Sequence, residues 1–360
     1  MGITESVLRF GFYAQSTHCP SRECADFVAK SLWRFKMNNK RFRLGYSLLG
    51  LLLLIGFIGA CGSSFEIIDD RPEEERNAVA APLKGQVVIE LAEFEQLAGE
   101  GATIIDVRKL EEYEQGHYPG AVHNNGGREW KDDFGILIAD IPLAQQLVRD
   151  LGVDNARPVV IYGSPRSTGA FRLHWTLEYY GHGEVYVYAP GYPALEAGLN
   201  FTPETDAPEI TKGDFVLAKR PSAIATADEV RAAIDDENAV LIDTRRETEF
   251  EGTEVRQSGD QDDPRQGNIP GAIWYYWENV FDENDNLRPK EEIRAEFEAA
   301  GFLKEGAVVV AYCQTGTRST VIYGLLRWLG EEPKNYDGSW AEWSRGDYPI
   351  AQPQLENHSE

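Results

Sequence analysis

The feature that most constrains the fold of this chain is an internal repeat. Each half has an apolar run ending in Asp-x-Arg, followed by Gly-x-x-Pro-Gly-Ala at 116–121 and again at 267–272. A second apolar run ends at Tyr162 in the first half and at Tyr312 in the second. Continuous apolar runs that alternate with amphipathic helical patterns are typical of parallel strands covered by helices on both faces. The sequence therefore predicts an α/β fold of two similar domains, each with a mainly parallel sheet.

The second half also carries a loop with a cysteine. Between the apolar run 307–312 and a helical pattern over 319–329 stands Cys313-Gln314-Thr315-Gly316-Thr317-Arg318. A helix that begins after a loop directs its unpaired N–H groups and positive dipole end at that loop, which favours an anion or a thiolate there. A thiol pKa is ordinarily about 8.5, and a helix N-terminus with a nearby arginine lowers it. Cys313 is therefore predicted to be a nucleophile, the alternative being a small buried cysteine that only packs.

The corresponding loop of the first half has no thiol. It reads Gly163-Ser-Pro-Arg-Ser-Thr168, with a proline where a flexible cradle would be needed. Ser164 could act as a hydroxyl nucleophile, but no partner signature surrounds it. The first half is therefore predicted to be structural.

The N-terminal region has the pattern of an export signal. Residues 44–60 carry no charge, follow Lys40, Arg41 and Arg43, and end in small residues before Cys61. This is the layout of a signal peptide, and Ile58-Gly-Ala-Cys61 resembles the lipobox of bacterial lipoproteins. We expect a lipid on Cys61, the alternative being a simple one-pass anchor. The chain has 59 Asp and Glu against 35 Lys and Arg, so we expect no binding to nucleic acid.

The repeat, the inactive first loop, the Cys313 loop and Tyr336-Asp-Gly-Ser-Trp340 together resemble the tandem-domain rhodaneses, the thiosulfate or 3-mercaptopyruvate sulfurtransferase family. The resemblance covers about 87–349. It implies that Cys313 carries a persulfide from a small anionic sulfur donor to cyanide or a thiol. A thioredoxin-like protein is one candidate acceptor. No metal or other cofactor is expected.

The N-terminal pattern, the composition and the resemblance together divide the chain into segments. These are an upstream extension of the gene start (1–36), a lipoprotein signal peptide (37–60), a flexible acidic tether (61–83), an inactive rhodanese-like domain (84–203), a linker (204–221), a catalytic rhodanese domain (222–350) and a disordered tail (351–360). The expected location is the periplasmic side of a bacterial envelope, with the outer membrane favoured over the inner because Gly62, and not aspartate, follows Cys61.

Arginines are the expected ligands of the donor. Arg318 closes the loop with a forked set of donors suited to an oxyanion, and Arg256 or Arg265 from an insertion in the second half is expected to join it. Arg245 is a third candidate, although its equivalent Arg108 occurs where no catalysis is expected, which favours a salt-bridge role. The position at which the two-domain enzymes usually have another arginine is Glu249 here.

Several functional alternatives stay open. Thiosulfate is the preferred donor because Arg318 favours a dianion, and 3-mercaptopyruvate is second. A lipoprotein that relays or binds persulfide sulfur would use the same cysteine, whereas a non-catalytic lipoprotein would need it to be inert. A Cys-based phosphatase or arsenate reductase is disfavoured because its Cys-x5-Arg loop is one residue longer.

Overall fold

The computed structural model describes residues 69, 71–131, 136–137, 140–254 and 265–351, which belong to one compact unit of the chain. The predicted extension, signal peptide and Cys61 lie outside these residues. Among the helices that are described, none combines the length and apolar character needed to span a bilayer.

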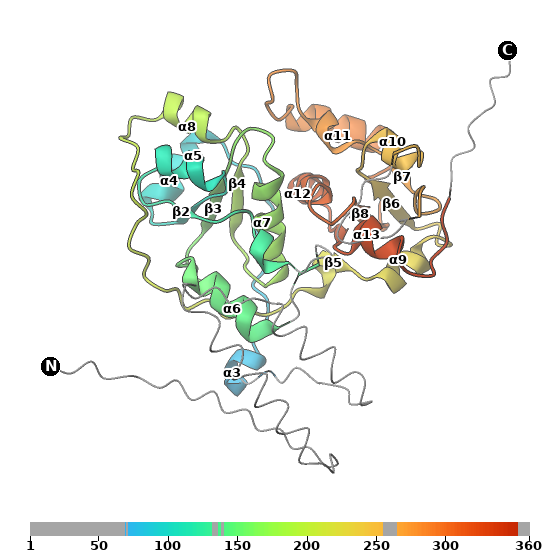
Figure 1. Cartoon of the computed structure of the whole chain (residues 1–360), viewed down its shortest axis with the longest axis horizontal. Coiled ribbons are helices and arrows are strands. Elements are labelled where there is room, and N and C mark those ends of the chain that lie inside the picture. Colours follow the sequence, from blue (N-terminus) through green and yellow to red (C-terminus); the bar gives the residue numbers. More distant parts are fainter. Residues whose placement is uncertain (1–68, 70, 132–135, 138–139, 255–264, 352–360) are drawn as a thin grey trace, which may run out of the picture. The chain divides into compact units, whose positions relative to one another are not determined.

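The first domain has a parallel sheet in the order β2-β1-β3-β4 (Figure 1). Its strands are β1 (Thr103–Asp106), β2 (Val122–His123), β3 (Val159–Tyr162) and β4 (Val185–Tyr188). The helices described with it are α3 (Glu73–Arg76), α4 (Leu91–Gly99), α5 (Leu110–Gln115), η1 (Arg128–Trp130), α6 (Ile141–Asp150), α7 (Thr168–Tyr179) and α8 (Tyr192–Gly198).

The second domain repeats this arrangement with the strand order β5-β9-β8-β6-β7, again parallel. Its strands are β5 (Ile224–Ala225), β6 (Ala239–Asp243), β7 (Ile273–Trp274), β8 (Val308–Tyr312) and β9 (Lys334–Tyr336). The helices described with it are η2 (Pro221–Ala223), α9 (Ala227–Ala233), α10 (Glu247–Phe250), η3 (Trp277–Val280), α11 (Lys290–Ala299), α12 (Ser319–Leu329) and α13 (Ser339–Trp343). The predicted α/β class is confirmed.

Strands β3 and β8 lack charged and amide side chains along their whole length because both faces of each sheet are covered. In β8, Val309 and Ala311 belong to one buried cluster, whereas Val310 and Tyr312 belong to another. Side chains alternate between the two faces of a strand, so the strand contributes to a core on each side. This accounts for the continuous apolar run that precedes the cysteine.

The two domains share a core through α7 and α12, which pack side by side (Figure 1). Gly324 of α12 permits this approach, since a Cβ there would lie 2.7 Å from the ring of Phe171 in α7. Both helices follow the loops that correspond to each other in the repeat. The loop of the first domain and the cysteine loop of the second are thereby linked through one helix pair.

Part of the predicted flexible tether is folded, which corrects that expectation. The Arg71 guanidinium donates to Gln145 Oε1 at 2.9 Å and to the carbonyl of Leu217 at 2.8 Å, and Ala81 N donates to the carbonyl of Gly181. The acidic composition concealed these contacts because they are made by polar groups without an apolar period. The predicted linker also packs, with Phe215 and Leu217 buried against the first domain.

Candidate active site

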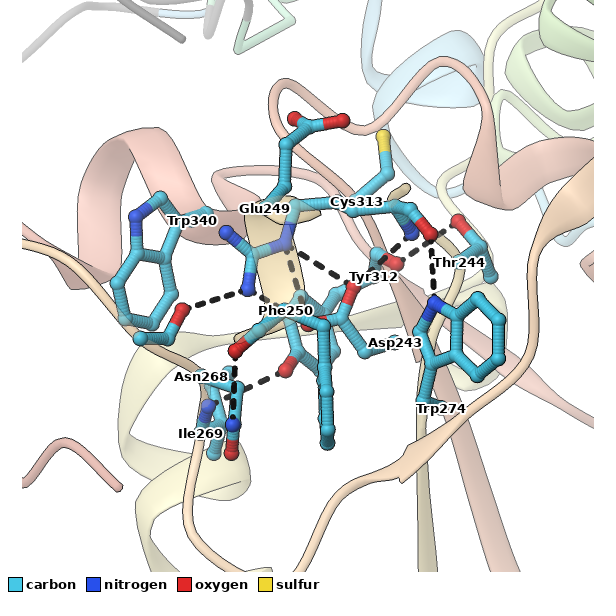
Figure 2. Close-up of polar contacts among 12 residues, drawn as sticks. Asp243, Thr244, Glu249, Phe250, Asn268, Ile269, Trp274, Tyr312, Cys313 and Trp340 are labelled. Atoms are coloured by element: carbon cyan, nitrogen blue, oxygen red, sulfur yellow. Dashed lines mark hydrogen bonds and ion pairs between the residues drawn. The ribbon is translucent and has the colours of Figure 1, made fainter. Parts of the chain in front are cut away.

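Cys313 lies where β8 ends, and α12 begins at Ser319, as the loop pattern predicted. Its side chain is 1% exposed and is the free thiol of the described residues. In Figure 2 the side chains of Cys313 and Glu249 extend in the same direction from this end of the sheet. The described residues contain no group of three or more acidic, His or Cys side chains that could hold a metal.

Several groups around the sulfur favour its charged form. Burial raises the pKa of the Cys313 thiol, but the Arg318 charge, the N–H groups of Ser319 and Thr315 and the Ser319 hydroxyl together bring it below its ordinary value. Ser319 Oγ lies 3.7 Å from Sγ and 2.6 Å from Asn335 Oδ1. The loop therefore stabilises a thiolate, as a nucleophile requires.

The segment after β9 fixes the start of the loop. Cys313 N donates to Ser339 Oγ at 3.1 Å, while the N–H groups of Trp340 and Ala341 donate to the carbonyls of Cys313 and Gln314 at 3.0 and 2.9 Å. Ser339 adopts the left-handed region with a φ of 52°. The sequence marked this segment only through the family resemblance. The positioning roles of Ser339 and Asn335 were missed, because neither has a spacing signal relative to Cys313.

Gly316 meets two requirements at once. Its φ is +68°, a value that side chains other than glycine rarely adopt, and a Cβ there would lie 2.5 Å from the carbonyl oxygen of Asp337. Only glycine therefore fits the backbone turn that the loop makes at this position.

Arg318 is the last residue of the loop, but two of its guanidinium N–H groups are directed to a carboxylate of the protein. NH1 lies 2.7 Å from Glu249 Oε2 and NH2 lies 2.8 Å from Oε1. Burial lowers the pKa of the Arg318 guanidinium, but Glu249 and the Cys313 thiolate raise it above its ordinary value. Glu249 of α10 thus takes up two of the guanidinium donors that were expected to face the sulfur donor, and the role of Arg318 in donor binding stays a prediction.

The other predicted arginines are placed away from this role. Arg245 binds Asp243 through Nε and NH2 at 3.0 and 2.7 Å, donates to the carbonyl of Gly267 and lies over the Trp340 ring at 4.5 Å. In the first domain Arg108 makes the same contacts with Asp106 and Gly116. A shared contact in a domain without the thiol identifies Arg245 as structural.

Arg265 serves the C-terminal segment. Its guanidinium donates to the carbonyls of Trp343, Ser344, Gly346 and Tyr348, which leaves it engaged there and not in the cysteine loop. This corrects its expected role in donor binding. Arg256 lies outside the described residues and stays a prediction.

Two cations from the first domain reach the loop, and sequence reasoning missed both. Lys131 Nζ donates to the carbonyl of Thr315 and to Thr317 Oγ1, each at 2.9 Å. Arg172 NH1 donates to the carbonyl of Gly316 at 2.8 Å and pairs with Asp337. Only the packing of the first domain against the second brings these distant residues together.

The corresponding loop of the first domain is built for packing. Ser167 caps α7 by accepting from Ala170 N, and a Cβ at Gly163 would lie 2.4 Å from Ser167 Oγ. Arg166 pairs with Glu278 at 3.5 Å and with Asp285 at 3.0 Å across the domain boundary. These contacts agree with a structural first domain.

Comparison with known proteins places this arrangement in a family. The rhodanese-like domain family matches residues 90–197 and 226–346. The sulfur carrier protein TtuD of Thermus thermophilus is 31% identical over 241 residues, which cover 64% of this chain and 83% of that protein. A putative thiosulfate sulfurtransferase of Saccharopolyspora erythraea is 31% identical over 255 residues, covering 67% and 87%.

A solved structure agrees with the fold. SseA of Escherichia coli, a 3-mercaptopyruvate sulfotransferase by its description, superposes with a TM-score of 0.60 at 24% identity and covers 71% of this chain and 99% of its own. The matched segments coincide with the two sheets and include the Cys313 loop. The chain belongs to the rhodanese-like family and is a sulfurtransferase built from two rhodanese-like domains.

Proposed function

We propose that the protein moves a sulfane sulfur from thiosulfate, through a persulfide on Cys313, to a thiophilic acceptor such as cyanide or a thiol. The observation that carries this proposal is the buried thiol at the start of α12, whose pKa is lowered by Arg318 and by N–H groups of the loop. Relatives named thiosulfate sulfurtransferase support the choice of donor.

The reaction divides into two displacements. The Cys313 thiolate attacks the outer sulfur of thiosulfate, the bond between the two sulfurs of the donor breaks, and its electron pair leaves with sulfite. The acceptor then attacks the outer sulfur of the persulfide and releases the Cys313 thiolate. With cyanide the product is thiocyanate, and no external oxidant or reductant is needed.

The loop acts on both steps through the same groups. Backbone N–H donors of Thr315 and Ser319 face the sulfur and stabilise a thiolate before transfer and a persulfide anion after it. They are fixed before the donor arrives, so little reorganisation is needed when charge moves onto sulfur. Arg318 contributes its charge while its donors stay on Glu249.

The Glu249–Arg318 pair is also compatible with an alternative donor and with an alternative function. A paired guanidinium attracts a dianion less strongly than a lone one, which leaves 3-mercaptopyruvate as the alternative donor. It equally suits persulfide sulfur handed on to a protein thiol, and one relative is named a sulfur carrier protein. Phosphoryl or arsenate chemistry is disfavoured because Cys313 and Arg318 enclose four residues and not five.

Mass spectrometry after incubation with thiosulfate tests the proposal. We expect Cys313 to gain one sulfur atom and to lose it on addition of cyanide, with thiocyanate released. The variant Cys313→Ser should gain no sulfur while keeping its melting temperature, since a hydroxyl of high pKa cannot take the sulfur. An unmodified Cys313, or hydrolysis of p-nitrophenyl phosphate without thiocyanate formation, would contradict the proposal.

We also propose, on the pattern around Cys61 alone, that the protein is a lipoprotein. Its body would then lie on the periplasmic side of a bacterial envelope, with the outer membrane favoured. Lipidation would leave Cys313 as the free thiol of the mature chain.

A further inference from the structure

We propose that Lys131 and Arg172 of the first domain are positioning residues for the reaction at Cys313: they hold the carbonyls of Thr315 and Gly316 and so fix the loop conformation in which backbone N–H groups face the reacting sulfur. The inference rests on the proposed function of this loop. It gives the domain without a thiol a direct part in the chemistry of the other.

Lys131 follows η1 in the first domain and contacts the loop at two atoms. Its Nζ donates to the carbonyl of Thr315 and to Thr317 Oγ1, each at 2.9 Å, over 184 and 186 residues of sequence. A hydrogen bond from an ammonium group is stronger than one between neutral groups. Lys131 therefore fixes the orientation of the peptide between Thr315 and Gly316.

Arg172 fixes the next peptide. It lies in α7, is 1% exposed, and donates through NH1 to the carbonyl of Gly316 at 2.8 Å. Asn335 Nδ2 donates to the same carbonyl at 3.3 Å. Arg172 also pairs with Asp337, which accepts from Leu137 N at 2.9 Å and lies against Gly316. The first domain thus contacts the Gly316 carbonyl through Arg172, and it contacts the neighbouring Asp337 through Arg172 and Leu137.

Because the peptide unit is planar, contacts that hold a carbonyl also set the orientation of the N–H group that follows it. In a trans peptide the carbonyl and the following N–H point in opposite directions, and the described residues contain no cis peptide bond. Holding two successive carbonyls therefore fixes the orientation of two peptide units between Thr315 and Ser319, the residues whose N–H groups favour the Cys313 thiolate. Successive N–H groups arranged around a left-handed residue form a concavity for an anion. Gly316 is that residue.

The positive charges of Lys131 and Arg172 at these carbonyls also strengthen the N–H donors of the same peptide units. A cation bound to a peptide oxygen polarises the unit, so its N–H becomes a better donor. Arg172 pairs with Asp337, and Arg318 pairs with Glu249. The Lys131 ammonium group contacts the loop directly. Among the described residues, the charged groups that act on the loop include Lys131, Arg172, Arg318, Glu249, Asp337 and Asp243.

The pH profile of Cys313 alkylation by iodoacetamide tests the inference, because only the thiolate reacts. The variants are Lys131→Met, which removes the charge, and Lys131→Arg, which restores it. Lys84→Met is the matched control, since Lys84 pairs with Glu184 on the surface of the first domain. At a pH below the thiol pKa, Lys131→Met should react about 3- to 10-fold more slowly, as expected for loss of one nearby charge. The profile should move to higher pH, and Lys131→Arg should recover most of the rate.

Persulfide formation from thiosulfate should slow in parallel with alkylation. The inference is overturned if Lys131→Met and Lys84→Met give the same profile while circular dichroism shows both to be folded. If Lys131→Met does not fold, the variant Arg172→Lys tests the inference in its place. That variant keeps a charge and loses the planar guanidinium that bonds both the Gly316 carbonyl and Asp337, so it should slow alkylation, and a wild-type profile in it would overturn the inference.

Alkylation requires no sulfur donor, which separates this test from that of the proposed function. A wild-type protein that takes no sulfur from thiosulfate would refute the proposed function, whatever its alkylation profile. A Lys131→Met variant with the control's profile would refute the positioning role even where sulfur transfer is intact.

Discussion

Glu249 and Arg318 form a two-point ion pair beside the reactive thiol, with N–O distances of 2.7 and 2.8 Å. Their side chains are 1% and 13% exposed, so the pair is largely shielded from solvent. A sulfur donor that reaches the loop meets an arginine whose fork is already occupied. Arg318 then acts mainly on the thiolate, through its charge, and less on the oxygens of the donor.

This relationship predicts how Arg318 variants respond to different donors. Arg318→Ala should lower kcat/KM with thiosulfate by about 10- to 150-fold, the range for losing a charge-assisted contact of about 1.5 to 3 kcal/mol. Arg318→Lys should lose less because it keeps the charge. The losses should be similar for thiosulfate and 3-mercaptopyruvate, because the thiolate is common to both. Steady-state kinetics with both donors provide the measurement, and a much larger loss with thiosulfate would show instead that Arg318 binds the dianion.

The pair also predicts a dependence of stability on pH. Burial raises the pKa of the Glu249 carboxyl, but bonding to Arg318 lowers it below its ordinary value of 4.5. The unfolded chain therefore takes up this proton at a higher pH than the folded protein does. The stabilisation is complete above the unfolded value and is lost as the pH falls through the folded value.

Melting temperatures of wild type and Glu249→Gln from neutral to acidic pH test this dependence. Glu249→Gln should be less stable at neutral pH, and the difference should shrink below pH 4.5. Glu291→Gln, at an exposed position in α11, is the control and should follow the wild type. A constant difference between wild type and Glu249→Gln would show that the carboxylate charge is not responsible.

Gly316→Ala should cost more than the strain of its backbone. Gly306 has a similar φ of +72°, and a Cβ added there would meet nothing within 4 Å, so Gly306→Ala carries the left-handed strain alone, about 1 to 2 kcal/mol. At Gly316 the same methyl group meets the Asp337 carbonyl, which should add about 1 to 3 kcal/mol. Denaturant unfolding compares the two variants. Equal free energies of unfolding for the two variants would mean that the loop shifts to accommodate the methyl group with no further loss of stability.

Cys61→Ser tests the lipid anchor. Without lipidation, a single apolar run of signal-peptide length is a poor permanent anchor. We therefore expect the variant to appear in the soluble fraction or as the unprocessed chain. Fractionation with mass spectrometry of the N-terminus makes the distinction. A variant that stays in the membrane with its signal segment, under conditions in which processing is shown to be active, would indicate a simple membrane anchor.

Much of the architecture could be predicted because it depends on local pattern. The helix expected over 319–329 is α12. Strand, cysteine loop and helix are consecutive, so their order alone places Cys313 at the end of a buried strand and before a helix N-terminus. The sequence by itself therefore determined the fold class, the repeat and the place of the cysteine in the fold.

The partners of the loop were decided only by tertiary structure. Glu249 meets Arg318 because β6 and β8 are neighbours in the sheet, and Arg172 meets the loop because α7 packs on α12. Lys131, which follows η1, also reaches the loop from the first domain. Arg265 was a candidate for the donor, but backbone carbonyls take up its donors instead. Arg245 pairs with Asp243, in the salt-bridge role that was favoured for it. A long cationic side chain can reach many acceptors, and which one it binds depends on packing between segments far apart in the chain. No local pattern in the sequence records that choice.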